Sequence, residues 1–295
     1  MLSLVSRVPD LTPVLEQTDR PTLGPSEVRV GVAAAAFTYF DAFVAKDHAT
    51  FGLPNLIGLG FDFSGTVLEV GPQVIGLKLG DRVAGMHADP AAPSRAHAEE
   101  VVVAADALGI VPDGLSLEAA AAVTLSALTA RQALDLLDRP HGSLLVTGGA
   151  GSVGGWVVAL AHRDGWAVDA LVRPAAEKVA RRAGASNVLT ALPEPTYDAV
   201  VDAAAIQTAA LGAVRDGGRF VGVKPGRDVP TERGIDVSVV LARPDGRMLA
   251  DLLRLAVADD LPVRIAAKRP LVAAAAAYQE ALAAAGSAGR WLLIP

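Results

Sequence analysis

The chain has 295 residues, of which 52% are hydrophobic and 20% charged, and its formal net charge is −6. This length favours two lobes of ordinary domain size, and the composition is that of a folded globular protein. The acidic balance argues against a nucleic-acid partner. The sequence contains no cysteine, which excludes disulfides, thiolate zinc sites, iron–sulfur clusters and a cysteine nucleophile.

The first third of the chain predicts a compact antiparallel barrel. Short segments that alternate polar and apolar residues are separated by Gly- and Pro-rich stretches, which is typical of strands. Asp62 and Asp81 lie in turn-like motifs, and we predict that both form turns. The expected strands are 26–34, 64–70, 81–84 and 98–104.

From residue 116 onward the pattern predicts alternating helices and strands, and therefore βαβ units with a parallel sheet. Ser116 is placed to cap the first helix. The uncharged stretch 140–162 is too rich in glycine for a membrane span, so we expect a soluble, cytoplasmic protein without a membrane partner. The predicted helices are 116–137, 152–164, 175–183, 246–258 and 272–285, and the strands are 144–147, 167–172, 187–190, 198–202, 218–223, 236–241 and 291–294.

A glycine loop, Gly149-Ala-Gly151-Ser-Val-Gly154, lies between the predicted strand 144–147 and the predicted helix 152–164. We expect Gly149 to allow the tight turn, Gly151 to let backbone amides approach a pyrophosphate, and Gly154 to let helix and strand pack closely. Ser152 and Val153 open the helix, whose N-terminus attracts phosphate. The alternative is a glycine-rich turn that binds nothing.

The end of the next predicted strand distinguishes the two nicotinamide cofactors. NAD-binding proteins place a carboxylate there for the ribose 2′-hydroxyl, but this chain has Arg173, and Asp169 falls too early. Arg173 can pair with the 2′-phosphate of NADPH, and Lys178, Arg181 and Arg182 would add positive potential. NADPH is therefore the predicted cofactor. The alternative is that Arg173 is a solvated loop residue.

Several motifs together resemble the zinc-independent quinone oxidoreductases of the medium-chain dehydrogenase/reductase superfamily. Each motif is weak alone, but their order and spacing are specific and extend nearly from end to end. The matching segments are 24–28 (GPSEV), 38–41 (TYFD), 60–65 (GFDFSG), 70–71 (VG), 80–83 (GDRV), 98–99 (AE), 111–116 (VPDGLS), 128–130 (LTA), 146–154 (VTGGAGSVG), 197–202 (YDAVVD), 217–219 (GGR) and 289–293 (GRWLL).

The resemblance implies an α/β protein with a GroES-like β-barrel lobe, residues 1–118 and 244–295, and a Rossmann lobe with a doubly wound parallel sheet, residues 119–243. It also implies hydride transfer from NADPH to a quinone or an activated C=C bond, with a small-molecule substrate in the cleft between the lobes. Homodimers are common in the family, so we expect one here. The lack of cysteine fits the zinc-free branch.

The resemblance carries cofactor contacts onto individual residues. Beyond the glycine loop, Thr129 falls where relatives contact the nicotinamide end, and Thr38 falls where they often have an Asn that touches cofactor or substrate. The family's frequent Lys aligns with Ala176, and a Tyr of some enone reductases is replaced near Ala49. Relatives are longer between Gly226 and Asp236. The residues that follow strands whose ends face the cofactor are Ala203, Ala204, Ala205, Gly222 and Val223.

Hydride delivery to an enone leaves an enolate that needs a proton and a hydrogen-bond donor. Tyr39 could donate to the substrate carbonyl, or it could simply pack. His48 could protonate the enolate, or it could be a solvent-exposed loop histidine. Asp41 matches a family position that we interpret as structural, and His97 could face the cleft. Water can supply the proton instead.

Three functions are compatible with the sequence. The first is an NADPH-dependent reductase of quinones or α,β-unsaturated carbonyls. The second is an enzyme of the same fold that couples hydride addition to cyclisation or another tailoring step, for which the departures at Thr38 and Ala49 leave room. The third is a non-catalytic NADPH-binding protein.

Overall fold

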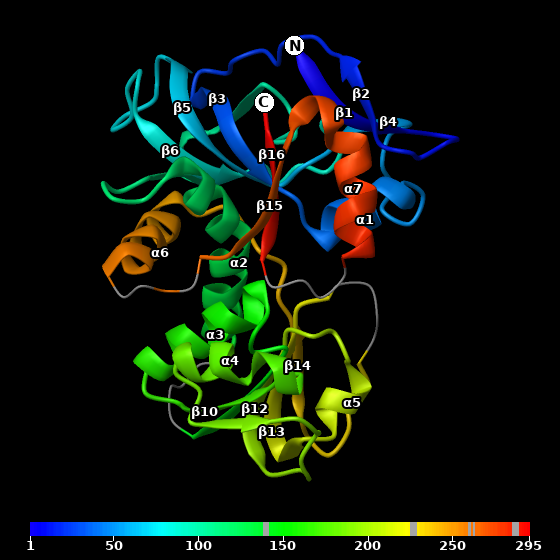
Figure 1. Ribbon diagram of the computed structural model, residues 1–295, viewed down its shortest axis with the longest axis vertical. Helices are drawn as coiled ribbons and strands as arrows, with labels where there is room; N and C mark the ends of the chain where they lie inside the picture. Colours follow the sequence, from blue (N-terminus) through cyan, green and yellow to red (C-terminus); the bar gives the residue numbers. More distant parts are fainter. Residues whose placement is uncertain (138–141, 225–228, 259–260, 262, 285–288) are drawn as a thin grey trace. The chain divides into compact units, whose positions relative to one another are not determined.

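The computed structural model describes residues 1–137, 142–224, 229–258, 261, 263–284 and 289–295. Contacts divide the chain into two compact units. The first consists of Met1–Leu125 together with Arg243–Pro295, and the second is the continuous segment Ser126–Ala242. The chain therefore leaves the first unit once and returns to it, and both labelled ends belong to that unit (Figure 1).

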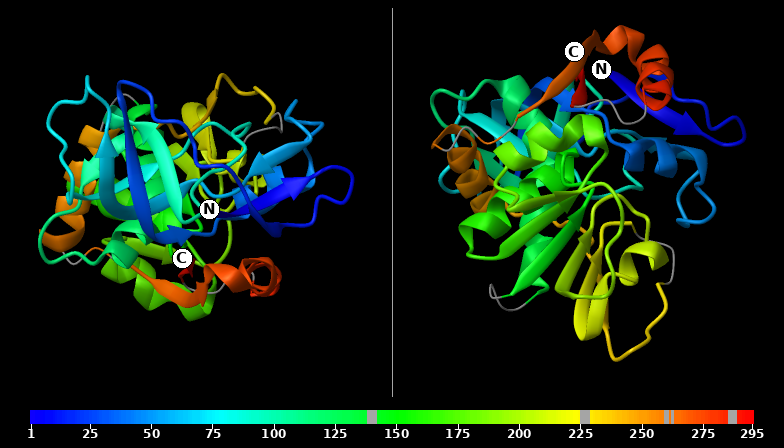
Figure 2. Two further views of the ribbon diagram at one scale, coloured as in Figure 1. Left: turned by 90° about the horizontal axis from the view of Figure 1, so that it is seen from above. Right: turned by 60° about the horizontal axis from the view of Figure 1, so that its bottom comes forward.

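The first unit is built on two sheets, blue to cyan with red strands in Figures 1 and 2. Every strand pair in them is antiparallel except β15 with β16. The larger sheet has the order β15 (Ile265–Pro270), β16 (Arg290–Ile294), β3 (Glu27–Ala36), β5 (Asp62–Val70), β6 (Arg82–Met86), β8 (Leu108–Ile110), with β7 (Glu100–Ala104) also on β3, and the smaller is β2 (Val14–Gln17), β1 (Leu2–Arg7), β4 (Leu56–Gly58).

Alternation along β3 builds the barrel core, as the sequence pattern predicts. Val28, Val30 and Val32 are buried and pack with Phe63 of β5 and Val83 of β6. Packing of β-branched side chains on one face of a twisted sheet is the usual way that a strand of this composition is stabilised. The opposite face of β3 carries the polar contacts described next.

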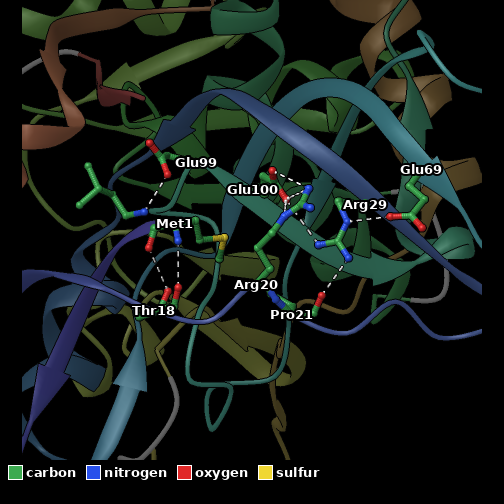
Figure 3. Close-up of polar contacts among 9 residues, drawn as sticks. Met1, Thr18, Arg20, Pro21, Arg29, Glu69, Glu99 and Glu100 are labelled. Atoms are coloured by element: carbon green, nitrogen blue, oxygen red, sulfur yellow. Dashed lines mark hydrogen bonds and ion pairs between the residues drawn. The ribbon is translucent and has the colours of Figure 1, made fainter.

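A charged network joins the first segment of the chain to the barrel (Figure 3). Arg29 of β3 is almost fully buried, and its guanidinium contacts Glu69, Glu100 and the carbonyl oxygen of Pro21. Arg20 forms a two-bond pair with Glu100, at 2.8 and 2.9 Å. Because a buried guanidinium needs all its partners, this network holds the stretch before β3 against the sheet.

Four helices accompany the barrel sheets. They are α1 (Tyr39–Lys46), α2 (Leu117–Asp135), α6 (Gly246–Ala258) and α7 (Ala274–Ala283). Helix α6 packs on β8, where a Cβ on Gly109 would lie 2.9 Å from the Ala250 nitrogen. Ser116 accepts a hydrogen bond from Ala119 N at 3.1 Å and so caps α2, as expected. The first unit's segment Met1–Leu125 ends within α2, so the later part of this helix belongs to the second unit.

The second unit is a parallel six-stranded sheet with helices on it, green to yellow in Figures 1 and 2. Helix α3 (Ser152–Arg163) packs on β9, β10 and β12, and α5 (Thr208–Leu211) on β12 and β13. Helix α4 (Glu177–Arg182) packs on β11. The order is β11 (Asn187–Leu189), β10 (Ala167–Leu171), β9 (Ser143–Thr147), β12 (Tyr197–Asp202), β13 (Val214–Gly222), β14 (Asp236–Val239).

This architecture confirms the predicted fold class, a GroES-like barrel together with a parallel Rossmann sheet. The sequence pattern did not predict β1, β2, β4, α1, β8, α5 or β15. The predicted domain junction at 118/119 falls inside α2. Within the described residues, no helix combines the length and apolarity needed to cross a bilayer.

Candidate dinucleotide site

The glycine loop connects the end of β9, Thr147, to the start of α3, Ser152. Its left-handed residue is Gly148, with φ of +62°, and Gly151 N donates to Gly148 O at 2.7 Å. The tight turn is therefore made at Gly148. The sequence motif predicted it one residue later, at Gly149. A side chain at Gly148 would be strained because L-residues rarely adopt this conformation.

The other glycines allow close approach of backbone. A Cβ on Gly149 would lie 2.7 Å from Ala170 Cβ in β10, and a Cβ on Gly154 would overlap the Gly148 carbonyl group. Gly151 has only the Gly148 oxygen nearby, at 3.1 Å from an added Cβ. The predicted packing role of Gly154 is therefore visible in the loop, whereas Gly149 serves packing and not the turn.

Helix α3 begins with unpaired backbone donors. Its N-cap, Gly151, forms no side-chain cap, and among the described residues the first amide of the helix with a partner is Gly155 N, bonded to Gly151 O at 3.0 Å. Ser152, Val153 and Gly154 therefore offer N–H groups at the positive end of the helix dipole. A glycine cradle with free amide donors fits a pyrophosphate group.

The end of β10 carries no carboxylate for a ribose hydroxyl. Asp169 lies inside the strand, where its Oδ2 accepts from the Tyr197 hydroxyl at 2.7 Å and its Oδ1 accepts from Asn187. Burial beside this carboxylate raises the pKa of Tyr197, so the phenol stays a donor. Arg173 is exposed, and it directly precedes the short helical turn Pro174–Ala176.

A buried hydrogen-bond network lies at the ends of β9 and β12. Thr147 Oγ1 donates to Asp202 Oδ1 at 2.5 Å and accepts from Ala204 N at 3.0 Å. Ala203 and Ala204 follow directly, and a Cβ on Gly148 would lie 3.2 Å from Ala204 N. Of the predicted residues, Ala204 is thus brought beside the glycine loop, and Ala203 directly precedes it.

The other residues of the second unit that were predicted to contact the cofactor lie on elements other than the glycine loop. Gly222 ends β13 and Val223 follows it. Thr129 is almost fully buried in α2. The resemblance predicts that relatives are longer between Gly226 and Asp236. Gly226 lies outside the described residues.

Thr38 and Tyr39 belong to the barrel unit. Thr38 is the N-cap of α1, and its hydroxyl and backbone N–H both donate to Asp41 Oδ2 at 2.7 Å, while Asp41 N donates to its hydroxyl at 2.9 Å. This capping box supports a structural role for Asp41. Tyr39 is half exposed and contacts Phe37 edge to face, with ring centroids 6.0 Å apart.

His48 is buried, so the expectation of a solvent-exposed histidine is wrong. Its ring is held by Pro54 O at 2.8 Å and by Ser6 Oγ at 3.0 Å, and the Ser6 hydroxyl is also 2.7 Å from Ala45 O. The pattern missed this because β1, which supplies Ser6, was not predicted. Both ring nitrogens are occupied, which favours a structural role over proton transfer.

His97 is buried against Tyr278 of α7. A carbonyl oxygen can only accept, so the 3.3 Å contact with Ala36 O assigns the proton to Nε2. Nδ1 then accepts from the Tyr278 hydroxyl at 2.8 Å. Burial lowers the pKa of His97 and raises that of Tyr278, which keeps both rings neutral.

Arg95 is a buried cation that the sequence pattern did not single out. Its Nε donates to Gly58 O at 2.8 Å, and its guanidinium lies 4.3 Å from the centre of the Phe61 ring. Neither Nη atom has a partner among the described residues, and the same is true of Asp41 Oδ1 and His87 Nδ1.

Asp62 is not a turn-former, which corrects the prediction. It lies in β5, fully buried, where it pairs with Arg290 of β16 and accepts from Leu125 N of α2 at 2.9 Å. Burial raises its pKa to about 7 against the opposing effect of Arg290. Asp81 does accept from Lys78 N at 2.9 Å, as a turn residue would.

Comparisons with known proteins agree with this architecture. Residues 24–132 match the alcohol dehydrogenase GroES-like domain. The quinone oxidoreductase from Coxiella burnetii has the same fold, with a TM-score of 0.86 and 24% identity over 100% of this chain and 98% of that one. A structure described as an NAD-dependent alcohol dehydrogenase matches at a TM-score of 0.85 and 26% identity, with both chains fully covered.

Curated relatives include rat "Quinone oxidoreductase-like protein 2", 35% identical over 48% of this chain and 39% of that protein. The chain therefore contains an alcohol dehydrogenase GroES-like domain and shares its fold with quinone oxidoreductases and alcohol dehydrogenases. The chain also matches the polyketide synthase GfsB of Streptomyces halstedii, 35% identical over 68% of this chain but only 4% of that protein. The chain thus spans well under two thirds of these relatives.

The glycine loop and the start of α3 fit the pyrophosphate of a dinucleotide. Within the part of the chain that the structure describes, no group of three or more His, Asp or Glu residues is arranged to hold a metal ion.

Proposed function

We propose that this protein is an NADPH-dependent reductase that transfers hydride to a quinone or an α,β-unsaturated carbonyl. The observation that carries the proposal is the start of α3, where a glycine cradle and three unpaired amides lie beside strand β10, whose carboxylate is already engaged by Tyr197 and Asn187. The quinone oxidoreductase relatives support the acceptor class.

The cofactor, when bound, supplies the hydride. The residues of the loop then bind and orient it: the amides of Ser152, Val153 and Gly154 would hold the pyrophosphate, and Arg173 would pair with the 2′-phosphate. Tyr39 is exposed enough to donate a hydrogen bond to a substrate carbonyl oxygen. His48 is not part of this mechanism because both its ring nitrogens are occupied, and water supplies the proton to the enolate.

The contacts predicted for Thr38, Thr129, Ala203, Ala204, Gly222 and Val223 belong to the same proposal. So do the small-molecule substrate, the homodimer, the cytoplasmic location and the domain limits at residues 118/119 and 243/244.

Turnover tests the reaction directly. The protein is mixed with NADPH or NADH and with a panel of quinones and enones, and the nicotinamide absorbance at about 340 nm is followed. We expect consumption of NADPH in preference to NADH. Tight NADPH binding without turnover of any acceptor would contradict the reductase and favour a tailoring enzyme or a non-catalytic binding protein.

Arg173→Glu tests the cofactor preference. Replacing the cation with a carboxylate should repel the 2′-phosphate and weaken NADPH binding by roughly tenfold or more, with little effect on NADH. Arg215→Glu serves as the control. It makes the same charge change beside Asp198, at the amino-terminal end of β13. An unchanged ratio of NADPH to NADH affinity in Arg173→Glu would refute the role given to Arg173.

A further inference from the structure

Strands β9 and β12 carry the same hydroxyl–carboxylate pair at each end. At their start, Ser143 Oγ lies 2.8 Å from Asp198 Oδ2, and at their end Thr147 Oγ1 lies 2.5 Å from Asp202 Oδ1. The register sets Thr147 directly opposite Asp202. The two pairs differ in surroundings, because the Asp198 side chain is 38% exposed and paired with Arg215, whereas Thr147 and Asp202 are fully buried.

Asp202 holds the loop that follows β12. Besides the Thr147 hydroxyl, its carboxylate accepts from Ile206 N at 3.2 Å and from Gln207 N at 2.6 Å. Thr147 in turn accepts from Ala204 N. A single buried carboxylate and its hydroxyl partner therefore bind three of the backbone amides between residues 203 and 207. A buried carboxylate is stable only when its oxygens are satisfied in this way.

The loop that these bonds hold is strained. Ala205 has φ of +55° and Gln207 has φ of +51°, in a region that residues with a Cβ rarely adopt. Such conformations persist where the surrounding contacts over-determine them, and they are concentrated at ligand sites. Here the contacts that enforce them are the bonds from Thr147 and Asp202.

One backbone amide of this loop has no hydrogen-bond acceptor within the described structure. Ala203 N donates to Val201 O at 3.2 Å, and Ala204, Ile206 and Gln207 donate as described. Within the described structure, the N–H of Ala205 has no acceptor, and Ala205 is partly exposed. The loop also abuts the glycine turn, since a Cβ on Gly148 would lie 3.2 to 3.3 Å from atoms of Ala204.

We propose that Asp202 and Thr147 are positioning residues of the dinucleotide site. They hold residues 203–207, with Ala205 and Gln207 at positive φ, beside the glycine loop so that the N–H of Ala205 can donate to the bound dinucleotide. The inference rests on the proposed function, because it requires that the glycine loop binds a nicotinamide dinucleotide. Neither side chain touches the ligand in this arrangement; both act through the loop backbone.

The test compares the two ends of the same strand pair. Asp202→Asn keeps the size of the side chain but leaves it one acceptor oxygen for three donors, so we expect the Kd for NADPH to rise about tenfold or more. Asp198→Asn makes the same change at the other end and should leave the Kd within about twofold of the wild type. Each Kd is measured by fluorescence titration well below the melting temperature of that variant.

A second pair keeps the test independent of folding defects in Asp202→Asn. Thr147→Val removes the hydroxyl at nearly constant volume and should weaken NADPH binding about tenfold, while Thr147→Ser, which keeps the hydroxyl, should restore it. A merely structural role would lower the melting temperature in Thr147→Val without moving the Kd of the folded protein.

The outcomes separate this inference from the proposed function. If the wild type binds neither NADPH nor NADH, the proposed function fails and this inference fails with it. If the wild type binds and the variants at both ends change the Kd equally, or if Thr147→Val binds as Thr147→Ser does, the inference alone is overturned. Selective weakening at Asp202 and Thr147 supports it.

Discussion

Several side chains of the barrel unit are buried although their residue types are usually exposed. Arg95 and His97 are buried, and His87 is partly buried with its Nδ1 atom out of contact with solvent. All three come from the stretch between β6 and β7, and nothing in their local sequence distinguishes them from surface residues. Their burial depends on partners distant in the sequence, such as Tyr278 for His97. The same dependence explains why His48 was expected to be exposed.

His87 should make stability depend on pH. Burial, and then the positive charge of Arg95, lowers its pKa from 6.5 to about 4. In the unfolded chain the His87 imidazole is protonated below about pH 6.5, whereas in the folded protein it is protonated only below about pH 4. The free energy of unfolding therefore decreases as the pH falls from about 6.5 to about 4. The full effect of such a shift is about 3 kcal/mol.

Replacing His87 with Gln should remove this contribution. Between pH 6.5 and 4 the variant should lose about 3 kcal/mol less stability than the wild type, as measured by urea denaturation at several pH values. Asp62, whose raised pKa acts with the opposite sign below about pH 7, is present in both proteins and cancels in the comparison. Parallel stability curves for the two proteins would contradict the prediction.

At the scale of elements, the second unit was predictable because its signals are local. The strand–glycine loop–helix order and the helix limits of α3 and α6 follow from periodicity and caps within about 20 residues. The left-handed turn at Gly148 was assigned to Gly149, since the motif spacing does not show which glycine packs on β10. The link between Thr147 and Asp202 could not be predicted, because it depends on the register of strands 55 residues apart.

The barrel was predicted less completely for a physical reason. Strands such as β1, β4 and β15 are stabilised by neighbours from remote segments, so the local sequence signal for them is weak. Helix α1 has only eight residues and depends on the capping box of Thr38 and Asp41. Of the candidate site, the backbone cradle was therefore predictable from sequence, and the side-chain surroundings of Tyr39 and His48 were not.

Two neighbouring glycines of α3 offer a matched test of the loop. A Cβ at Gly154 would overlap the Gly148 carbonyl, whereas at Gly155 its nearest neighbour is Gly149 O at 3.8 Å. Gly154→Ala should push helix and turn apart and weaken NADPH binding at least about tenfold, with a loss of roughly 1–3 kcal/mol in stability. Gly155→Ala should fold and bind as the wild type does, and gain up to about 1 kcal/mol from helix propensity. Equal behaviour of the two variants in titration and thermal melting would show that the close contact is unimportant.

For the whole molecule, the buried pair of Asp62 and Arg290 joins segments 228 residues apart. It links β5 to β16, the two strands that flank β3 in the larger sheet. Removing one partner of such a pair leaves a charge buried without compensation, which typically costs about 3–5 kcal/mol.

Arg290→Met should therefore destabilise the protein by about 3–5 kcal/mol at pH 8, and by less at pH 5, where the Asp62 carboxyl takes up a proton. Adding Asp62→Asn to Arg290→Met should recover part of the loss, because the amide oxygen still accepts from Leu125 N. Denaturation followed by tryptophan fluorescence measures each variant. A double variant as unstable as the sum of both single changes would mean that the two residues do not interact.

The position of β16 also has a consequence for synthesis on the ribosome. The segment Ser126–Ala242 is continuous, so its whole parallel sheet can assemble as soon as it leaves the exit tunnel. The barrel cannot, because Ala35 and Ala36 of β3 pair with Leu292 and Leu293, which are translated only after the whole of Ser126–Ala242. Until then the nascent chain carries an unpaired strand edge and an uncompensated Asp62. The amino-terminal strands of the barrel are thus made before the parallel sheet and completed after it, and during that interval they are the part that a chaperone would have to shield.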